Sequence, residues 1–338
     1  MSEGRETAVL ISDWSQYIQD SHSFVGNLKF CRRPQGGDPS WLMFVSDTGE
    51  VRVYDYLGVH HPEDDIALGF NPDDAYINNE DPPKIAVKQA TAIRVYEEGA
   101  QLLNTGAIAN LQYINISNGF LHCTVGGNVG FQWRSLVDGG VLHTVSLVNM
   151  SGNVVGQVVP TEAGTVAFTQ YRDSTGSLIG WTVKADTDEI LWKYQFFRTG
   201  GSMRYLRAAG DGSIIISSEW AGGWGRVIVL NEFGVIINVY DPSAAVNYAV
   251  AAQPDGVCAA WALMASTTAR IVRMNGTVVN IVLPANIVSR QDAVEVVLGG
   301  YVLFECVDGN IYVYDLAGAL QATIVYTLAT SPLAALIR

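Results

Sequence analysis

The stretch AVEVVLGGYVLFECVDGNIYVYDLAGALQATIVY, Ala293–Tyr326, consists of four short apolar runs separated by turn residues. Apolar and polar positions alternate along the runs, which is typical of half-buried β-strands. The pairs Gly299-Gly300 and Asp308-Gly309 stand between runs, and hairpin turns favour such pairs because they accept a positive φ. The stretch therefore predicts one antiparallel sheet of four strands.

The same order of runs and turns recurs along the 338-residue chain. Clear copies span Asn27–His60, Arg204–Asp241 and Asn247–Pro284, less obvious ones begin at Leu111 and Val154, and a degenerate copy covers Ile66–Asn104. The turn between the third and fourth runs falls near Gly58, Gly99, Gly139, Asp188, Gly234, Gly276 and Gly318. A regular period of this length indicates a repeat architecture.

A single four-stranded sheet cannot cover both of its faces, whereas seven sheets arranged radially bury each face against a neighbour. We therefore predict an all-β fold, a seven-bladed β-propeller of four-stranded antiparallel blades, formed by residues 1–338 as one domain. The predicted blades span roughly residues 25–63, 64–105, 107–149, 150–197, 203–241, 246–284 and 290–326. The terminal segments 1–24 and 327–338 are expected to close the ring or to contact partners.

Two turns that follow predicted first strands, Gly210-Asp211-Gly212 and Pro254-Asp255-Gly256, resemble those of NHL and PQQ-like propellers, as does the glycine turn before the fourth strand. The resemblance covers nearly the whole chain and concerns the fold. It implies that the first strand of each blade lies at the centre of the ring, which makes the run at residues 66–70 the expected inner strand of the second blade. Residues 71–83 are then expected to be a loop outgrowth.

Charge argues against nucleic acid or an anionic membrane as a partner. The chain has 20 Lys and Arg against 33 Asp and Glu, a net charge of −13, and its longest basic run is Arg32-Arg33. Such a field repels phosphate groups. Since no apolar stretch approaches the roughly 20 residues of a membrane helix, and charges interrupt the first twenty residues, we expect a soluble protein without a signal peptide.

The stretch SSEWAGGWGRVIVL, Ser217–Leu230, contains the candidate binding residues Trp220, Trp224 and Arg226. One interpretation is a contact platform, because aromatic rings and arginine are enriched at interfaces. The alternative is that the glycines let a hairpin turn while both tryptophans pack over the rim of the blade. A phosphate cradle is disfavoured, since these glycines lie between two strands and open no helix.

Motifs for chemistry are scarce. The predicted inner strands carry few titratable residues, with Glu295 the clearest carboxylate, so neither catalytic residues nor a cofactor are predicted. Residues 60–65, HHPEDD, have a composition that can bind a metal, but their spacing matches no familiar motif. We interpret them as a solvated acidic connection and predict no metal ligands, leaving open a weak calcium site in the acidic region 60–81.

Together these features favour a non-enzymatic, structural or adhesive propeller that presents loops to other protein subunits of an assembly. Tailed-phage virions use propellers in tail nozzles and attachment proteins, and by that analogy of fold the expected home is a large particle such as a phage virion. The alternative is a carbohydrate-binding or hydrolytic propeller that uses the face with Trp220 and Trp224 and takes a surface glycan as its ligand.

Overall fold

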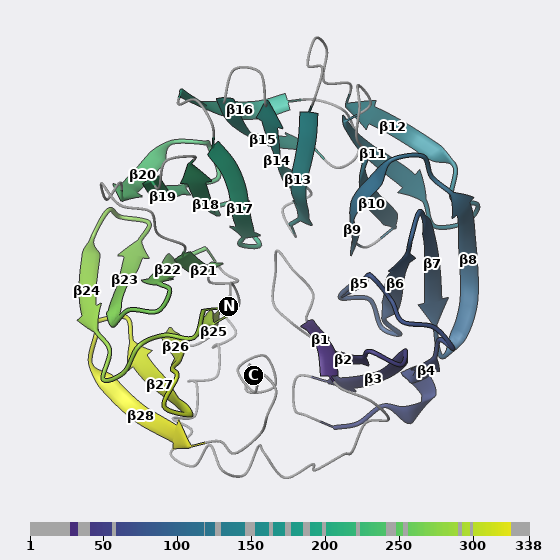
Figure 1. Ribbon diagram of the computed structural model, residues 1–338. Coiled ribbons are helices and arrows are strands. Elements are labelled where there is room, and N and C mark those ends of the chain that lie inside the picture. Colours follow the sequence, from purple (N-terminus) through teal and green to yellow (C-terminus); the bar gives the residue numbers. More distant parts are fainter. Residues whose placement is uncertain are drawn as a thin grey trace, which may run out of the picture.

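A computed structural model describes residues 28–32, 41–55, 59–117, 119–125, 130–145, 153–161, 165–172, 177–184, 190–197, 201–220, 224–240, 248–252, 256–289, 293–297 and 300–325. Seven four-stranded antiparallel sheets stand around a common centre like the blades of a propeller (Figure 1). Among the described residues the one helical element is a short 3-10 turn, η2 (Pro62–Asp64), and no helix has the length and apolar character that a membrane crossing requires. The predicted fold is confirmed.

The first four blades take their strands in chain order. Blade 1 contains β1 (Leu28–Arg32), β2 (Trp41–Ser46), β3 (Glu50–Asp55) and β4 (Ile66–Ala67). Blade 2 contains β5 (Asp74–Ile77), β6 (Lys84–Gln89), β7 (Ala92–Glu97) and β8 (Ala100–Ala107). Blade 3 contains β9 (Leu111–Ser117), β10 (Phe120–Val125), β11 (Gly130–Ser135) and β12 (Val141–Val145). Blade 4 contains β13 (Asn153–Pro160), β14 (Thr165–Arg172), β15 (Ser177–Lys184) and β16 (Ile190–Phe197).

The last three blades follow the same order. Blade 5 contains β17 (Gly201–Ala208), β18 (Ile214–Trp220), β19 (Trp224–Leu230) and β20 (Ile236–Tyr240). Blade 6 contains β21 (Tyr248–Ala252), β22 (Cys258–Leu263), β23 (Thr268–Arg273) and β24 (Val278–Val282). Blade 7 contains β25 (Val294–Val297), β26 (Tyr301–Glu305), β27 (Asn310–Asp315) and β28 (Leu320–Val325). The terminal segments that were expected to close the ring lie outside the described residues.

The boundary between the first two blades differs from the sequence-based expectation. Ile66 pairs with Val51 and Ala67 with Glu50, so this run is the outer strand of blade 1 and not the inner strand of blade 2. The inner strand of blade 2 is β5, which lies inside the acidic stretch that was expected to be a loop. The physical reason is burial, because Ala75, Tyr76 and Ile77 supply the apolar side chains that pack against both neighbouring blades.

Antiparallel order sorts the loops onto two faces of the ring. Hairpins between the second and third strands share one face with the blade-to-blade connections, and we call this the connection face. Turns between the first and second strands and between the third and fourth strands share the opposite face, which we call the turn face. The hairpin with Trp220 and Trp224 therefore belongs to the connection face.

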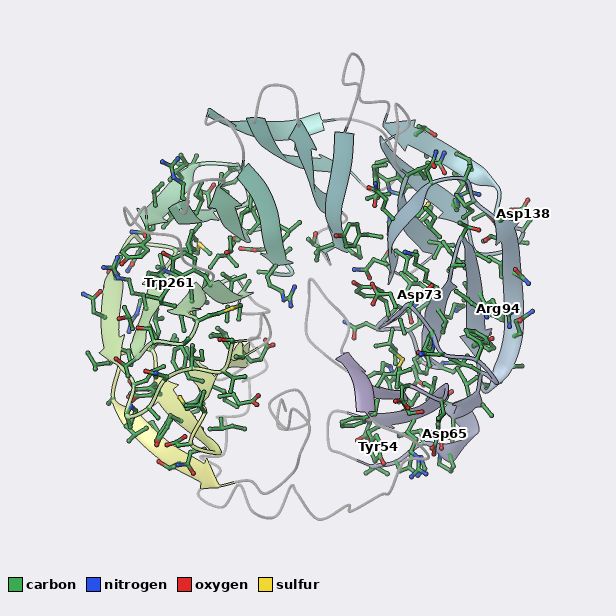
Figure 2. All side chains as sticks on the ribbon, in the orientation of Figure 1. Tyr54, Asp65, Asp73, Arg94, Asp138 and Trp261 are labelled. Carbon is green, nitrogen blue, oxygen red and sulfur yellow. The ribbon has the colours of Figure 1, made fainter. Side chains whose placement is uncertain are left out.

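Blade 6 shows how the core is built. Successive residues of β21 alternate between two apolar clusters: Ala249 and Ala251 pack with blade 7, whereas Tyr248, Val250 and Ala252 pack with blade 5. The alternation follows from the two-residue period of a strand, and here both faces of the sheet are buried. Trp261 of β22, labelled in Figure 2, packs in the cluster toward blade 5. Its ring contacts that of Tyr240 of β20. Small alanines on the other face let blade 7 approach closely.

The turns of blades 5 and 6 meet on the turn face. The Asp211 carboxylate accepts hydrogen bonds from the backbone N–H and the hydroxyl of Ser213, both at 2.8 Å, which fixes its position. Gly256 of the next blade has φ +79° and lies against this carboxylate, so that a Cβ there would stand 2.0 Å from Asp211 Oδ2. Only glycine satisfies both the backbone conformation and the close approach.

We expect Gly256→Ala to destabilise the protein by about 2–4 kcal/mol, since it combines a strained φ with a steric clash. Gly276→Ala is the matched control, because Gly276 has φ +88° in a turn of the same blade but no atom within 4 Å of the added Cβ. That control should cost only about 1 kcal/mol. Denaturant unfolding of both variants measures the difference, and equal losses would show that the contact with Asp211 does not matter.

Blade 3 contains a fully buried histidine. His122 of β10 stacks on Phe131 with ring centroids 5.9 Å apart, and its Nε2 lies 2.6 Å from Ser117 Oγ. Burial lowers the pKa of His122 to about 3, because a charged imidazolium would lose its hydration there. The folded protein therefore holds this side chain neutral at pH values where the unfolded chain protonates it.

Acid should destabilise the protein through His122. Between pH 6.5, the ordinary pKa of histidine, and pH 3 the unfolded chain binds a proton that the folded protein excludes, so stability falls as the pH falls. The His122 contribution amounts to about 1.4 kcal/mol per pH unit in that window. Chemical denaturation of wild type and His122→Gln at pH 7, 6, 5 and 4 should give a shallower loss in the variant; parallel curves would contradict the assignment.

Candidate functional site

The predicted binding residues lie at one end of the β18–β19 hairpin. The two strands pair in continuous register from Ile214 opposite Leu230 to Trp220 opposite Trp224. Residues 221–223 join them and lie outside the described residues, as do the side chains of both tryptophans. Directly paired residues of antiparallel strands share one face of the sheet, so the two tryptophan positions lie on the same face of blade 5.

The register also tells which face this is. Ile214 and Ile216 of β18 and Ile228 and Leu230 of β19 occupy the same face as the tryptophan positions, and they pack in a cluster with Val159 of blade 4. Arg226 lies on that face as well, is half-buried, and stands opposite Ser218. The positions of Trp220, Trp224 and Arg226 therefore lie on the face of blade 5 that packs against blade 4, at the end of the strands nearest the connection face.

The outer edge of the same blade is apolar and exposed. Phe233 and Val235 in the turn before β20 are 73% and 56% exposed, and Val239 within that strand is 43% exposed. Ile236 is exposed beside them. β20 is the last strand of its sheet, so one of its hydrogen-bonding edges has no partner within the blade. The sequence-based expectations did not include this surface, and its signal in the sequence is the apolar run FGVIINV in an outermost strand.

The described inner strands carry few carboxylates. On the described inner strands the carboxylates are Asp74 of β5 and Glu295 of β25, which belong to the non-adjacent blades 2 and 7. Asp74 accepts the backbone N–H of Ala75 at 3.0 Å, and Glu295 is half-buried. Arg207 of β17 is half-buried and donates to the Leu206 carbonyl at 3.1 Å. No pair of carboxylates converges among these residues.

Part of the acidic region holds the blades together. The Glu80 carbonyl oxygen accepts the indole N–H of Trp41 in blade 1 at 2.8 Å. Its carboxylate accepts the backbone N–H of Gly119 in blade 3 at 3.2 Å and pairs with Lys84 of its own blade. Lys84 also pairs with Glu97 at 2.8 Å. Glu80 thus joins three blades on the turn face, which gives it a structural role.

Residues 60–65 form a folded turn and not a solvated connection. The His61 backbone N–H donates to the Val53 carbonyl, and the Asp64 N–H closes η2 by donating to the His61 carbonyl. His60 Nε2 lies 2.9 Å from Asp65 Oδ2, while the other oxygen of Asp65 accepts the Val53 N–H. Figure 2 labels Asp65 beside Tyr54, whose ring packs on that of His60.

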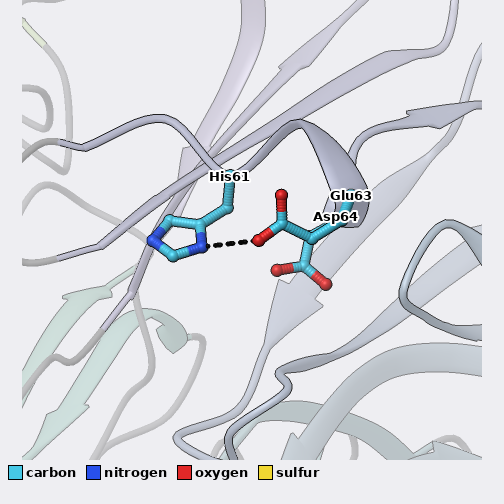
Figure 3. Close-up of side chains that lie close together, drawn as sticks. All are labelled: His61, Glu63 and Asp64. Atoms are coloured by element: carbon cyan, nitrogen blue, oxygen red, sulfur yellow. Dashed lines mark hydrogen bonds and ion pairs between the residues drawn. The ribbon is translucent and has the colours of Figure 1, made fainter.

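His61, Glu63 and Asp64 gather their polar atoms at one point of this turn (Figure 3). His61 Nδ1 lies 3.0 Å from Glu63 Oε1, and the His61 ring packs edge-on against Trp41. Asp64 is buried, and burial followed by the nearby charge of Glu63 raises the pKa of its carboxyl to about 6. Ionising a buried carboxyl group among other acidic side chains costs free energy, and Asp64 is the buried residue of the three.

No protein-family model matches the sequence, and no curated protein matches it. Solved structures with a similar fold are known. The Dos1 propeller has a TM-score of 0.60 at 12% identity, with 88% of this chain and 84% of that one covered. Hydrazine synthase of Kuenenia stuttgartiensis has a TM-score of 0.58 at 10% identity, covering 88% and 99%. BamB from Moraxella catarrhalis has a TM-score of 0.52 at 12% identity, covering 88% of each chain.

Identities this low establish a common architecture and carry no information about ligands or partners. The repeat pattern, the seven four-stranded sheets and the likeness to solved propellers agree on one fold. The chain is a seven-bladed β-propeller.

Proposed function

We propose that this protein is a non-enzymatic interaction propeller that binds a protein partner through blade 5. The observation that carries the proposal is the exposed apolar outer edge of that blade, formed by Phe233, Val235, Ile236 and Val239. Isolated exposed apolar residues are common on soluble domains, but four of them within seven residues, in one turn and the edge strand that follows it, form a contact surface. A protein partner that covers them gains the free energy of burial.

The edge strand adds a second source of affinity. The outer hydrogen-bonding edge of β20 has no partner within its sheet and can pair with an extended segment of another protein. In this mode of recognition the backbone supplies affinity and side-chain pockets supply specificity. The scarcity of carboxylates on the described inner strands supports a non-catalytic role. A large particle such as a virion is the setting we propose for such a subunit, on the analogy of fold with phage propellers.

The hairpin with Trp220, Trp224 and Arg226 is the second contact that we propose on this blade. The register sets both tryptophan positions on one face at the end of the ladder, which is the arrangement a two-ring platform requires. The same face carries core residues of blade 4 and blade 5 further along the strands, so the competing assignment is packing between blades. A glycan that stacks on the rings is the alternative ligand.

Photo-crosslinking tests the partner surface. A benzoylphenylalanine introduced at Phe233 or at Val239 should form a discrete protein adduct when the full chain is expressed in its native setting, because both positions are exposed. Leu102 on the outer strand of blade 2 is the matched control, since its exposed fraction of 47% is close to the 43% of Val239 and it lies on a different blade. The proposal fails if positions 233 and 239 give no protein adduct, or if position 102 gives the same one.

Truncation of the tryptophans tests the platform. The Trp220→Ala, Trp224→Ala double variant should keep the wild-type melting temperature and lose at least about 2 kcal/mol of binding to the crosslinked partner, as expected for hot-spot residues. Trp261→Ala is the control for a core tryptophan, because that side chain is fully buried, and it should cost about 3–5 kcal/mol of stability.

Three outcomes separate the assignments. If the double variant unfolds as early as Trp261→Ala while its folded fraction binds the partner normally, the tryptophans are packing residues. If it loses partner binding at an unchanged melting temperature, the platform is supported. If partner binding persists but binding on a glycan array disappears, the rings serve the carbohydrate alternative.

A further inference from the structure

We infer that His61, Glu63 and Asp64 form a binding site for one divalent metal ion of borderline softness, for which Zn²⁺ is the natural probe. The three residues offer one imidazole nitrogen and two carboxylate oxygens, and these ligand atoms all lie within 4.8 Å of one another. The site is local, since η2 and its preceding residue supply every ligand. It is separate from the partner surface on blade 5.

The strongest indication of a metal site is the burial of Asp64 together with its lack of a hydrogen-bond partner. Its side chain is 3% exposed, and its Oδ1 has no hydrogen-bond partner among the described residues. A buried carboxylate oxygen without a partner is unfavourable, and proteins satisfy such groups with a donor or a cation. The nearby polar groups of the cluster are Glu63, which cannot donate when ionised, and His61. A cation held between the three residues would satisfy Asp64.

The distances suit a small ion. His61 Nδ1 and Glu63 Oε1 are already 3.0 Å apart. Ligands that bind zinc tetrahedrally at about 2.0–2.2 Å stand roughly 3.4 Å from one another. This spacing lies between the 3.0 Å that separates His61 and Glu63 and the 4.8 Å within which all three ligand atoms lie. Glu63 is exposed, which leaves room for water molecules to complete the coordination.

The far side of the imidazole supports the same assignment. His61 Nε2 lies 3.7 Å from Asp55 Oδ2, which is too far for a hydrogen bond, and it has no hydrogen-bond partner among the described residues. Histidines that bind metals through one nitrogen usually direct the other N–H to a carboxylate or carbonyl, which orients the ring and raises its basicity. In this arrangement Nδ1 binds the metal, while Nε2 carries the proton and faces Asp55.

The donor set and the local charge select the ion. Ca²⁺ and Mg²⁺ prefer oxygen-only ligands, whereas an imidazole with two carboxylates suits Zn²⁺ and similar transition metals. Glu98 and Asp81 lie close enough to act on Asp64 through their charges, so the surroundings attract a cation. A Cβ at Gly99 would stand 3.2 Å from the Glu63 carbonyl oxygen, so the next blade supports the turn from behind.

Calorimetric titration of the chelator-treated full chain with Zn²⁺ tests the site. We expect one ion bound per chain and a rise in melting temperature of about 2 °C or more at saturating Zn²⁺. His61→Gln and Asp64→Asn should each weaken binding at least tenfold. His60→Gln is the matched control, because it removes a neighbouring imidazole that pairs with Asp65 and contributes no ligand; its affinity should stay within twofold of wild type.

Asp64→Asn also separates loss of the site from loss of the fold. Because this variant removes a buried, unpaired carboxylate, its melting temperature without metal should equal or exceed that of wild type. The inference is overturned if His60→Gln weakens binding as much as His61→Gln, if Asp64→Asn binds Zn²⁺ as wild type does, or if Ca²⁺ stabilises the protein and Zn²⁺ does not.

Discussion

Blades 2 and 6, whose side chains the structure describes, each have two apolar faces, and the ring exists because such faces cannot remain in water. Blade 6 shows the constraint most directly, since alternate residues of β21 pack against blade 7 and blade 5. Blade 2 behaves in the same way toward blades 1 and 3. Burial of apolar area makes the largest favourable contribution to the free energy of folding, so a sheet with two such faces requires a neighbour on each side.

Polar contacts then fix how neighbouring blades meet. Trp41 and Gly119 donate to Glu80 from the two blades beside it, and Asp211 lies against Gly256. Arg273 of blade 6 donates to the Leu316 carbonyl of blade 7 at 2.8 Å. These contacts are directional, whereas apolar packing is not, so they set the relative position of blades that hydrophobic burial only brings together.

The fold could be predicted from the sequence because strand periodicity and turn residues repeat every 40 to 49 residues. The boundary between blades 1 and 2 could not be predicted in this way. Ile66 and Ala67 have the composition of an inner strand, while Tyr76 and Ile77 are surrounded by acidic and turn residues. Local composition is a weak guide wherever tertiary packing decides which run is buried.

The candidate sites divide in the same way: one could be predicted from the sequence and the other could not. The hairpin that joins Trp220 to Trp224 follows from the spacing of the sequence. The burial of Asp64 could not be foreseen in HHPEDD, because it depends on how the folded turn packs.

The contacts of Glu80, Asp211 and Arg273 all lie on the turn face, and this has an evolutionary consequence. Insertions and exchanges in the hairpins of the connection face leave those contacts intact, so a gene for this ring can accumulate variation on that side while the assembled blades keep their positions. New binding specificities can therefore arise on the connection face by drift and selection of loops, without a compensating change in the framework.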